Sequence, residues 1–344
     1  MDNFTGDIRP PAKSGDVARL AGVSPATVSR AFNAPHLLDQ QTLARVRDAA
    51  ARLEYRPQGV ARSLRSRRSL LIGVLIPSLR NTYFAQTVER VQALLAERGY
   101  TVLIASSRYD PAAEMAAVKA MAAQGVDALL LVGRPLDAMS RPTATRLGLP
   151  SLRAWAWLDE PPCIGFDHDA ALRVVTQHLL SLGHRHFALV APFRALHDPL
   201  RSRLTAVREA LAEAGLALPP AAVIDDGGFG LADGRQALRV LHARGQTPTA
   251  VICSNDLLAA GVVLQAQAQG LAVPKDLSVS GYNDLDIATA LDPALTTVAT
   301  PMTDHATRVV AALLDLAQGR DVGTLTPLPT RLVVRGSTGP APGR

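Results

Sequence analysis

The chain of 344 residues is poor in several features that would place it in other classes of protein. Aromatic side chains make up only 4% of it, so the core must be built mainly from Ala, Val and Leu. It contains no run of 18 or more uncharged apolar residues, as a membrane-spanning helix would require. Its polar N-terminus lacks the apolar stretch of a secretory signal. We therefore expect a cytoplasmic protein without a membrane segment.

Signatures of redox, metal and enzyme chemistry are also missing. Cys163 and Cys253 lie far apart in apolar contexts, so we expect buried thiols of a reducing cytosol rather than a disulfide. His184 and His186 have no evident third ligand, and we expect no metal site. The chain has no G-x-G-x-x-G after a strand, no Walker loop and no G-x-S-x-G motif. We expect no cofactor and no catalytic residues.

The positive charge is concentrated at one end of the chain. Residues 1–68 hold twelve Lys/Arg and six Asp/Glu, which accounts for the whole formal net charge of +6. The remaining residues are balanced in charge. A basic end on a neutral body indicates a polyanionic partner for that end. On charge alone, a solvated basic face remains the alternative.

A short helix is expected over residues 16–21, because Val17, Leu20 and Ala21 fall on one helical face. Gly22 follows as a helix terminator, since glycine takes the left-handed conformation without strain.

A second helix is expected after this turn, with Ser24 as its N-cap and Pro25 in its first turn. A third helix over about 39–54 would close a three-helix core, and the whole is the pattern of a helix-turn-helix DNA-binding domain. On the second helix, Arg30 suits a guanine edge and the Ala26 methyl suits a thymine methyl, while small polar side chains suit phosphate oxygens. The candidate DNA-contacting residues of this helix are Ser24, Pro25, Ala26, Thr27, Ser29, Arg30 and Asn33.

From residue 70 the pattern changes to alternating apolar strands and amphipathic helices, with a second such series starting near residue 164. Repeated βα units of this kind indicate parallel sheets covered on both faces, here in two lobes. Ligands of such sheets bind at the carboxyl ends of the strands, so we expect a binding cleft there. Residues 293–301 are expected to cross back to the first lobe, and a last strand over about 327–334 to return to the second.

Four motifs carry a specific resemblance: VARLAGVSPATVSRAFN (17–33), YRP (55–57), VARSLRS (60–66) and IGVLIP (72–77). Together they resemble the lactose-repressor (LacI/GalR) family of bacterial transcription regulators, over about Gly15 to Ser337. The resemblance implies an N-terminal all-α helix-turn-helix domain and an α/β bilobal periplasmic-binding-protein-like core, with two parallel sheets flanked by helices. The expected parts are a disordered tail (1–14), a helix-turn-helix domain (15–56), a hinge (57–69), a core (70–337) and a C-terminal tail (338–344). Within the core, the N-subdomain is expected over about 70–167 and 300–326, and the C-subdomain over about 168–299 and 327–337.

The resemblance also implies that Pro57–Ser66 is a hinge helix whose Leu64 enters the minor groove, where an apolar wedge kinks the duplex. Arg62, Leu64 and Arg65 are the candidate DNA contacts of this segment. The segment is too short and too rich in arginine to be a stable helix alone, so we expect it to fold only with DNA and a second copy. An ordinary basic linker is the alternative.

The resemblance further places an effector cleft at the strand ends. Sugar-binding relatives carry aspartates where Trp155 and Asn283 fall, and this chain has arginines at 153, 201 and 203, which suit a carboxylate or phosphate. The stretch LRAWAWLDEPPCIGFDHDAA also resembles the gluconate-repressor branch, with Arg153 in place of an acid. A gluconate-like sugar acid is the expected effector, with a phosphorylated or neutral sugar as alternatives. Any single arginine could instead form a surface ion pair with Asp159, Asp167 or Asp198. The candidate effector residues are Ser78, Asn81, Tyr83, Phe84, Arg153, Trp155, Asp198, Arg201, Arg203, Phe229, Asn255 and Asn283.

These observations predict a sequence-specific DNA-binding regulator, most simply a repressor of a carbohydrate or sugar-acid catabolic operon that a small effector releases. A homodimer on a pseudo-palindromic operator is expected, because one short helix reads too few bases alone. An effector that strengthens DNA binding is equally allowed, since the coupling is reciprocal. Two other classes share the bilobal body: a transport solute-binding protein, which should have a signal peptide and lack residues 16–69, and an enzyme that uses the cleft.

Overall fold

The structure is a computed structural model that describes residues 12–55, 68–133, 139–158, 162–192 and 201–343. It divides into two compact units, Met1–Ser69 and Leu70–Arg344, and each is described by itself. The expected hinge contacts Arg62, Leu64 and Arg65 and the effector candidate Asp198 lie outside the described residues. Within the part that is described, no helix is both long and apolar enough to cross a bilayer.

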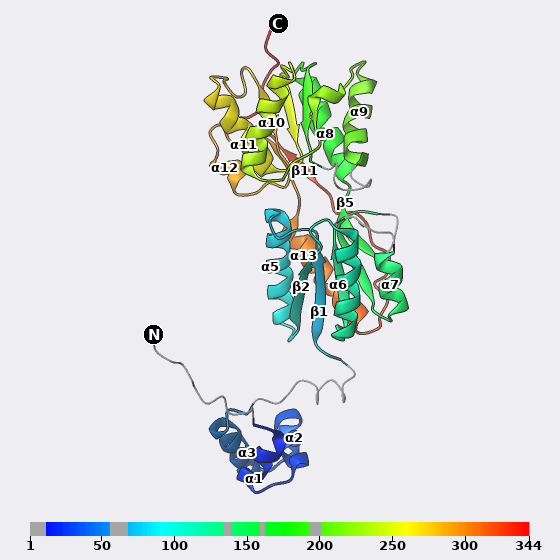
Figure 1. Cartoon of the computed structure of the whole chain (residues 1–344), viewed down its shortest axis with the longest axis vertical. Coiled ribbons are helices and arrows are strands. Elements are labelled where there is room, and N and C mark those ends of the chain that lie inside the picture. Colours follow the sequence, from blue (N-terminus) through cyan, green and yellow to red (C-terminus); the bar gives the residue numbers. More distant parts are fainter. Residues whose placement is uncertain (1–11, 56–67, 134–138, 159–161, 193–200, 344) are drawn as a thin grey trace. The chain divides into compact units, whose positions relative to one another are not determined.

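The N-terminal unit is a bundle of short helices around one core of small apolar side chains (Figure 1). Val17, Val28 and Val46, one from each main helix, are buried at its centre. Phe32 and Tyr55 pack at its rim, with ring centroids 5.9 Å apart. The helices are α1 (Ser14–Ala21), α2 (Pro25–Asn33) and α3 (Gln40–Arg52), with a 3-10 turn η1 (Pro35–Leu37) between α2 and α3.

Local chemistry sets the ends of these helices, and at Gly22 and Ser24 it does so as the sequence predicts. Gly22 takes the left-handed conformation (φ 63°) after α1, and the N–H of Val23 donates to the Ala18 carbonyl at 3.0 Å. The Ser24 Oγ accepts from the Thr27 N–H at 3.1 Å and caps α2. The side chain of Asp39 caps α3 in the same way.

The expectation that Leu20 lies on the buried face of α1 is wrong. Its side chain is 49% exposed, and Ala18 faces the core with Val17 and Ala21 instead. The chain after Gly22 returns close to α1 at Ala18, whose side chain is 4% exposed beneath the turn.

The first lobe of the second unit is built on a five-stranded parallel sheet in the order β2-β1-β3-β4-β5. Its two faces carry separate cores: helices α5 and α13 cover one face, and α6 and α7 cover the other (Figure 1). The strands are β1 (Leu71–Ile76), β2 (Thr101–Ser106), β3 (Ala128–Val132), β4 (Ser151–Ala156) and β5 (Cys163–Phe166). The helices are α5 (Thr82–Ala96), α6 (Pro111–Ala123), α7 (Ser140–Arg146) and α13 (Met302–Ala317).

The second lobe has a four-stranded parallel sheet in the order β7-β6-β8-β9, flanked by helices (Figure 1). The expected start of this series near residue 164 is wrong, because β5 pairs with β4 and completes the first sheet. The strands are β6 (Phe187–Val190), β7 (Val223–Ile224), β8 (Ala250–Cys253) and β9 (Ser278–Ser280). The helices are α8 (His168–Ser181), α9 (Arg201–Glu213), α10 (Leu231–Ala243), α11 (Asp256–Ala268) and α12 (Ile287–Ala290), with a 3-10 turn η2 (Pro220–Ala222).

Two short strands, β10 (Thr297–Ala299) and β11 (Arg331–Val333), pair antiparallel in a sheet of their own. The chain between them forms α13 in the first lobe and bridges β5 at Leu328. After β11, Ser337 bonds to β9 through its Oγ, which donates to the Val279 carbonyl at 2.6 Å. The chain therefore crosses between the lobes more than once, which is the expected bilobal architecture.

Candidate functional sites

The exposed face of α2 collects the residues expected to contact a polyanion. Ser24, Ala26, Ser29 and Arg30 are exposed and Thr27 is half-buried, while Val28 of the same helix is buried in the core. The side chain of Asn33 lies outside the described residues. A helix anchored on one face and lined on the other by small polar side chains and an arginine suits close approach to a DNA groove.

The hydroxyls of Ser24 and Thr27 lie 2.9 Å apart at the N-terminus of α2. One of the two hydroxyls donates its proton to the other, so the second hydroxyl proton remains available to donate to a partner. Together with the unsatisfied N–H groups of the first helical turn, this arrangement suits a phosphate oxygen.

Not every arginine of this unit is equally available to a partner. Arg19 pairs with Asp16 at 3.4 Å and Arg52 with Asp48 at 3.6 Å, all with exposed side chains. Exposed pairs of this kind are weak and are screened by salt.

In the second unit, Trp155 at the end of β4 is surrounded by aromatic rings. Its ring centroid lies 5.9 Å from that of Tyr83, 4.9 Å from Phe84 and 4.5 Å from His168. The structure thus brings three sequence-predicted residues together, although Tyr83 and Phe84 are buried core residues at the start of α5. Trp155 has φ 83°, a strained conformation for a bulky residue and one that occurs at functional sites.

His168, which sequence reasoning missed, connects Trp155 to the second lobe. Its Nε2 lies 3.1 Å from the Trp155 carbonyl oxygen and its Nδ1 lies 2.6 Å from the Tyr282 hydroxyl. Because a carbonyl only accepts, Nε2–H donates to it, and Nδ1 forms the hydrogen bond with the Tyr282 hydroxyl. His305 approaches the same strand, and burial lowers its pKa to about 4, so its ring is neutral at pH 7.

Arg153 lies within the first lobe rather than on its surface. Its side chain is 2% exposed, and Nη1 donates to the Gly133 carbonyl at 3.2 Å, at the end of β3. Arg153 is therefore a buried residue at the ends of the strands of the first sheet rather than an exposed one.

Asn255 and Phe229 meet at the carboxyl end of the second sheet. The Asn255 Oδ1 accepts from the Leu258 N–H at 2.7 Å and caps α11, while Nδ2 donates to the Phe229 carbonyl at 3.0 Å. The adjacent Ser254, which sequence reasoning missed, is 7% exposed, and its Oγ has no hydrogen-bond partner among the described residues. The position of Ser254 directly after β8 is the feature of the sequence that could have identified it as a site residue.

Asn283 follows β9 with φ 104°, and its N–H donates to the Val298 carbonyl at 2.8 Å. The residue is 5% exposed, yet its Oδ1 has no hydrogen-bond partner in the described part of the chain. Burying such an atom is costly, so Asn283 and Ser254 mark places where a bound molecule or water would be favoured.

Ser78 and Asn81 shape the loop after β1. The Ser78 Oγ accepts from the Arg80 N–H at 3.1 Å, and the Asn81 Oδ1 accepts from the Tyr83 N–H at 3.1 Å and caps α5. The remaining candidates, Asp198 and the side chains of Arg201 and Arg203, lie outside the described residues.

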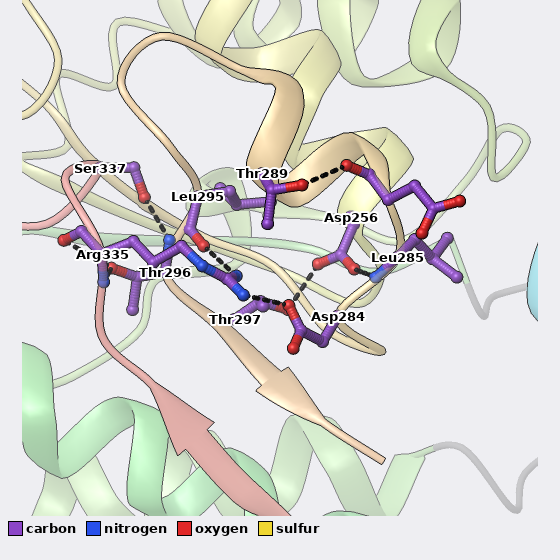
Figure 2. A network of polar contacts seen from close by, with 10 residues as sticks. Asp256, Asp284, Leu285, Thr289, Leu295, Thr296, Thr297, Arg335 and Ser337 are labelled. Atoms are coloured by element: carbon purple, nitrogen blue, oxygen red, sulfur yellow. Dashed lines mark hydrogen bonds and ion pairs between the residues drawn. The ribbon is translucent and has the colours of Figure 1, made fainter. Parts of the chain in front are cut away.

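Figure 2 shows a polar network of the second lobe that includes the buried Asp256. Its Oδ1 accepts from the Thr297 hydroxyl at 2.5 Å and its Oδ2 from the Leu285 N–H at 2.7 Å. Burial raises the pKa of Asp256 to about 7, and nearby Asp284 acts in the same direction. Asp284 in turn pairs with Arg335 at 2.7 Å. The network connects the segments that cross between the two lobes to the start of α11.

The described residues contain no group of three or more His, Cys, Asp or Glu side chains placed to hold a metal ion. Cys163 and Cys253 are both buried and are not joined in a disulfide, and burial raises the pKa of the Cys253 thiol.

Both units of the chain match known protein families. Residues 15–58 match the model of "Bacterial regulatory proteins, lacI family", and residues 176–338 match a "Periplasmic binding protein-like domain". The HTH-type transcriptional repressor CytR of Escherichia coli (strain K12) is 32% identical over 327 residues, which cover 94% of this chain and 95% of that protein.

Solved structures agree with these matches. A lac repressor dimer bound to operator and the anti-inducer ONPF has a TM-score of 0.82 and 30% identity, over 96% of this chain and 100% of that one. The transcription regulator GntR from Chromobacterium violaceum has a TM-score of 0.72 and 31% identity, over 78% of this chain and 99% of that one.

Proposed function

The chain belongs to the lacI family of bacterial regulatory proteins, and from this premise we propose that it represses a carbohydrate or sugar-acid catabolic operon. Membership of the family makes it a DNA-binding regulator of transcription. The observation that carries the proposal is the exposed polar face of α2, held on a compact helix-turn-helix unit.

On the DNA side, α2 enters the major groove of an operator half-site. Arg30 binds a guanine edge, Ala26 meets a thymine methyl, and the capping hydroxyls of Ser24 and Thr27 bind phosphate. Pro25, Ser29 and Asn33 complete the contacts of this helix. Arg62, Leu64 and Arg65 act in the minor groove, where Leu64 wedges between base steps.

A homodimer on a pseudo-palindromic operator follows from the need to read two half-sites. The lac repressor to which this chain is similar is a dimer on its operator. The edge strand β2 supports a contact between copies: Leu103 and Ile104 are each 38% exposed, and the described sheet has no strand beyond it. An exposed apolar edge of this kind invites pairing with another chain.

The effector is a gluconate-like sugar acid, and the protein falls in the gluconate-repressor branch. The likeness to the regulator GntR supports this branch. Ser254 and Asn283 offer buried oxygens to ligand hydroxyls, and Arg153, Arg201 and Arg203 supply the positive charge that a carboxylate requires. Trp155, Phe84 and Phe229 form apolar walls, and Ser78, Asn81, Tyr83, Asp198 and Asn255 shape the remaining site.

Effector binding weakens operator binding by linkage, because it favours an arrangement of the lobes in which the two hinges no longer fold together. A neutral sugar is the second candidate effector, since the side chains of Ser254 and Asn283 are uncharged, and a phosphorylated sugar is a further alternative, since arginines also suit a phosphate. A solute-binding protein of a transport system shares only the bilobal unit, and the helix-turn-helix unit favours a regulator over it.

Calorimetry on the full chain tests the effector class. D-Gluconate and related sugar acids are titrated against glucose and glucose 6-phosphate as matched ligands, and gel shifts on promoter DNA follow operator release. The proposal expects binding of the acids and loss of the shifted band. Tight binding of a neutral sugar alone would contradict it, and a chain that shifts no promoter DNA at low salt would contradict the DNA-binding role.

A further inference from the structure

Two aromatic rings from different lobes lie against each other at the strand carboxyl ends. Tyr109 belongs to the loop between β2 and α6 of the first lobe, and Phe229 to the loop between β7 and α10 of the second. Their ring centroids are 6.0 Å apart with an interplanar angle of 30°, a stacked arrangement. This distance lies in the range of direct aromatic contact, about 4.5–7 Å, so the rings touch each other rather than enclose a third ring.

The loop that presents Tyr109 is strained. Arg108 and Tyr109 both have left-handed backbones, with φ 53° and 62°, where glycine would be unstrained. The loop is held on both sides: the Ser107 N–H donates to the Ile76 carbonyl, and the Asp110 N–H donates to the Ser107 carbonyl, each at 3.0 Å. Glycine would form this turn without strain. A tyrosine in this conformation therefore indicates that the position of its side chain is the useful feature of the loop.

The other ring is tied to the candidate effector site. The Phe229 carbonyl accepts from Asn255 Nδ2 at 3.0 Å, and Asn255 is the neighbour of Ser254, whose buried Oγ has no partner among the described residues. The ring pair therefore adjoins the end of β8, where the proposed ligand hydroxyls would be bound. Both rings are half-buried, and Phe229 also packs against the core of the second lobe, so its ring is anchored on that lobe while it contacts Tyr109 of the first.

We infer that Tyr109 is a positioning residue of the effector site, whose stacking on Phe229 holds the two lobes together before the effector arrives. The inference rests on the proposed function, because it assumes that the effector binds between the strand ends. Holding the lobes in the binding arrangement lowers the ordering cost of binding, so the ring pair raises effector affinity without a hydrogen bond to the ligand. It thereby sets the effector concentration at which the repressor responds.

The test measures the distance between the lobes in the full chain without ligand. Spin labels are attached to cysteines introduced at the exposed positions Lys119 of α6 and Arg239 of α10. The two native cysteines, Cys163 and Cys253, are buried and do not compete for the label. Pulsed electron-paramagnetic-resonance spectroscopy then gives the distribution of distances between the labels.

The variants compared are Tyr109→Ala, Phe229→Ala, both together, Tyr109→Phe, and Arg108→Ala as the control in the same strained loop. The wild type, Tyr109→Phe and Arg108→Ala are expected to share one narrow distribution. Each of the other single variants should broaden it, and the double variant should add nothing further, because the same contact is already lost. With D-gluconate as the probe, Tyr109→Ala should weaken binding about two- to tenfold, and Tyr109→Phe should restore it.

The inference is overturned if Tyr109→Ala leaves the distance distribution unchanged, if Arg108→Ala broadens it equally, or if the two single variants act additively. Failure of the proposed function has a different signature. A wild-type chain that binds neither promoter DNA nor D-gluconate would remove the proposed role, while the label distances would still decide whether the ring pair holds the lobes together.

Discussion

Replacing Asp256 by asparagine is expected to remove one component of the pH dependence of stability. The carboxyl is fully buried, and its pKa is raised from an ordinary value of 3.8 to about 7. The folded protein therefore keeps this proton up to about pH 7, whereas the unfolded chain releases it near pH 4. Between these values the folded state binds more protons, so the contribution of Asp256 to the free energy of unfolding falls as the pH rises.

The size of the effect follows from the same two values. The interval from 3.8 to about 7 corresponds to about 4 kcal/mol, since each pKa unit is worth about 1.4 kcal/mol. In Asp256→Asn the side-chain carbonyl accepts from the Leu285 N–H as Oδ2 does in the wild type, and the amide donates to the Thr297 hydroxyl oxygen, which reverses the direction of the wild-type bond but keeps both partners satisfied without a charge. The variant should therefore match the wild type near pH 4 and exceed it by up to about 4 kcal/mol at pH 8.

Urea unfolding followed by circular dichroism from pH 4 to pH 8, at constant ionic strength, measures this difference. Histidines with lowered pKa values, His305 among them, contribute the opposite slope, but they are present in both proteins and cancel in the comparison. Asp286→Asn removes an exposed carboxylate nearby and serves as the control. A difference between Asp256→Asn and wild type that does not change with pH, or that falls as the pH rises, would refute the reasoning.

Three further predictions concern the DNA-binding unit and the hinge. Arg30→Ala should relax base preference at one operator position and cost about 1–3 kcal/mol there, measured on a set of operator variants. An equal loss on every sequence would instead make Arg30 a phosphate contact. Leu64→Ala should reduce DNA bending in circular-permutation gels, and unchanged bending would argue against a wedge. Gly22→Ala should destabilise the N-terminal unit by about 1 kcal/mol, because φ is 63° while the space around an added Cβ is open. Gly15→Ala, with equal space and no positive φ, should not; equal shifts in thermal melting would reject the strain argument.

Much of the local structure was predictable because it depends on residues close in sequence. Gly22 ends α1, Ser24 caps α2 and Asp39 caps α3 through bonds that span only a few residues. The apolar strands and helix periodicities likewise predicted the alternating elements of the second unit. The candidate site was less predictable, because Asn255 and Asn81 turned out to be helix caps, and the neighbouring Ser254 was not singled out.

The sequence by itself determined the helix-turn-helix pattern, the basic end of the chain and the two series of βα units, since each depends on local stereochemistry or composition. Only the tertiary structure decided that β5 pairs with β4, that Leu20 is exposed, and that Arg153 is buried. It alone brought Tyr109 to Phe229 and His168 to Tyr282. These outcomes depend on close packing between segments far apart in the chain. The sequence pattern of one segment does not show which distant segments it contacts in the folded protein.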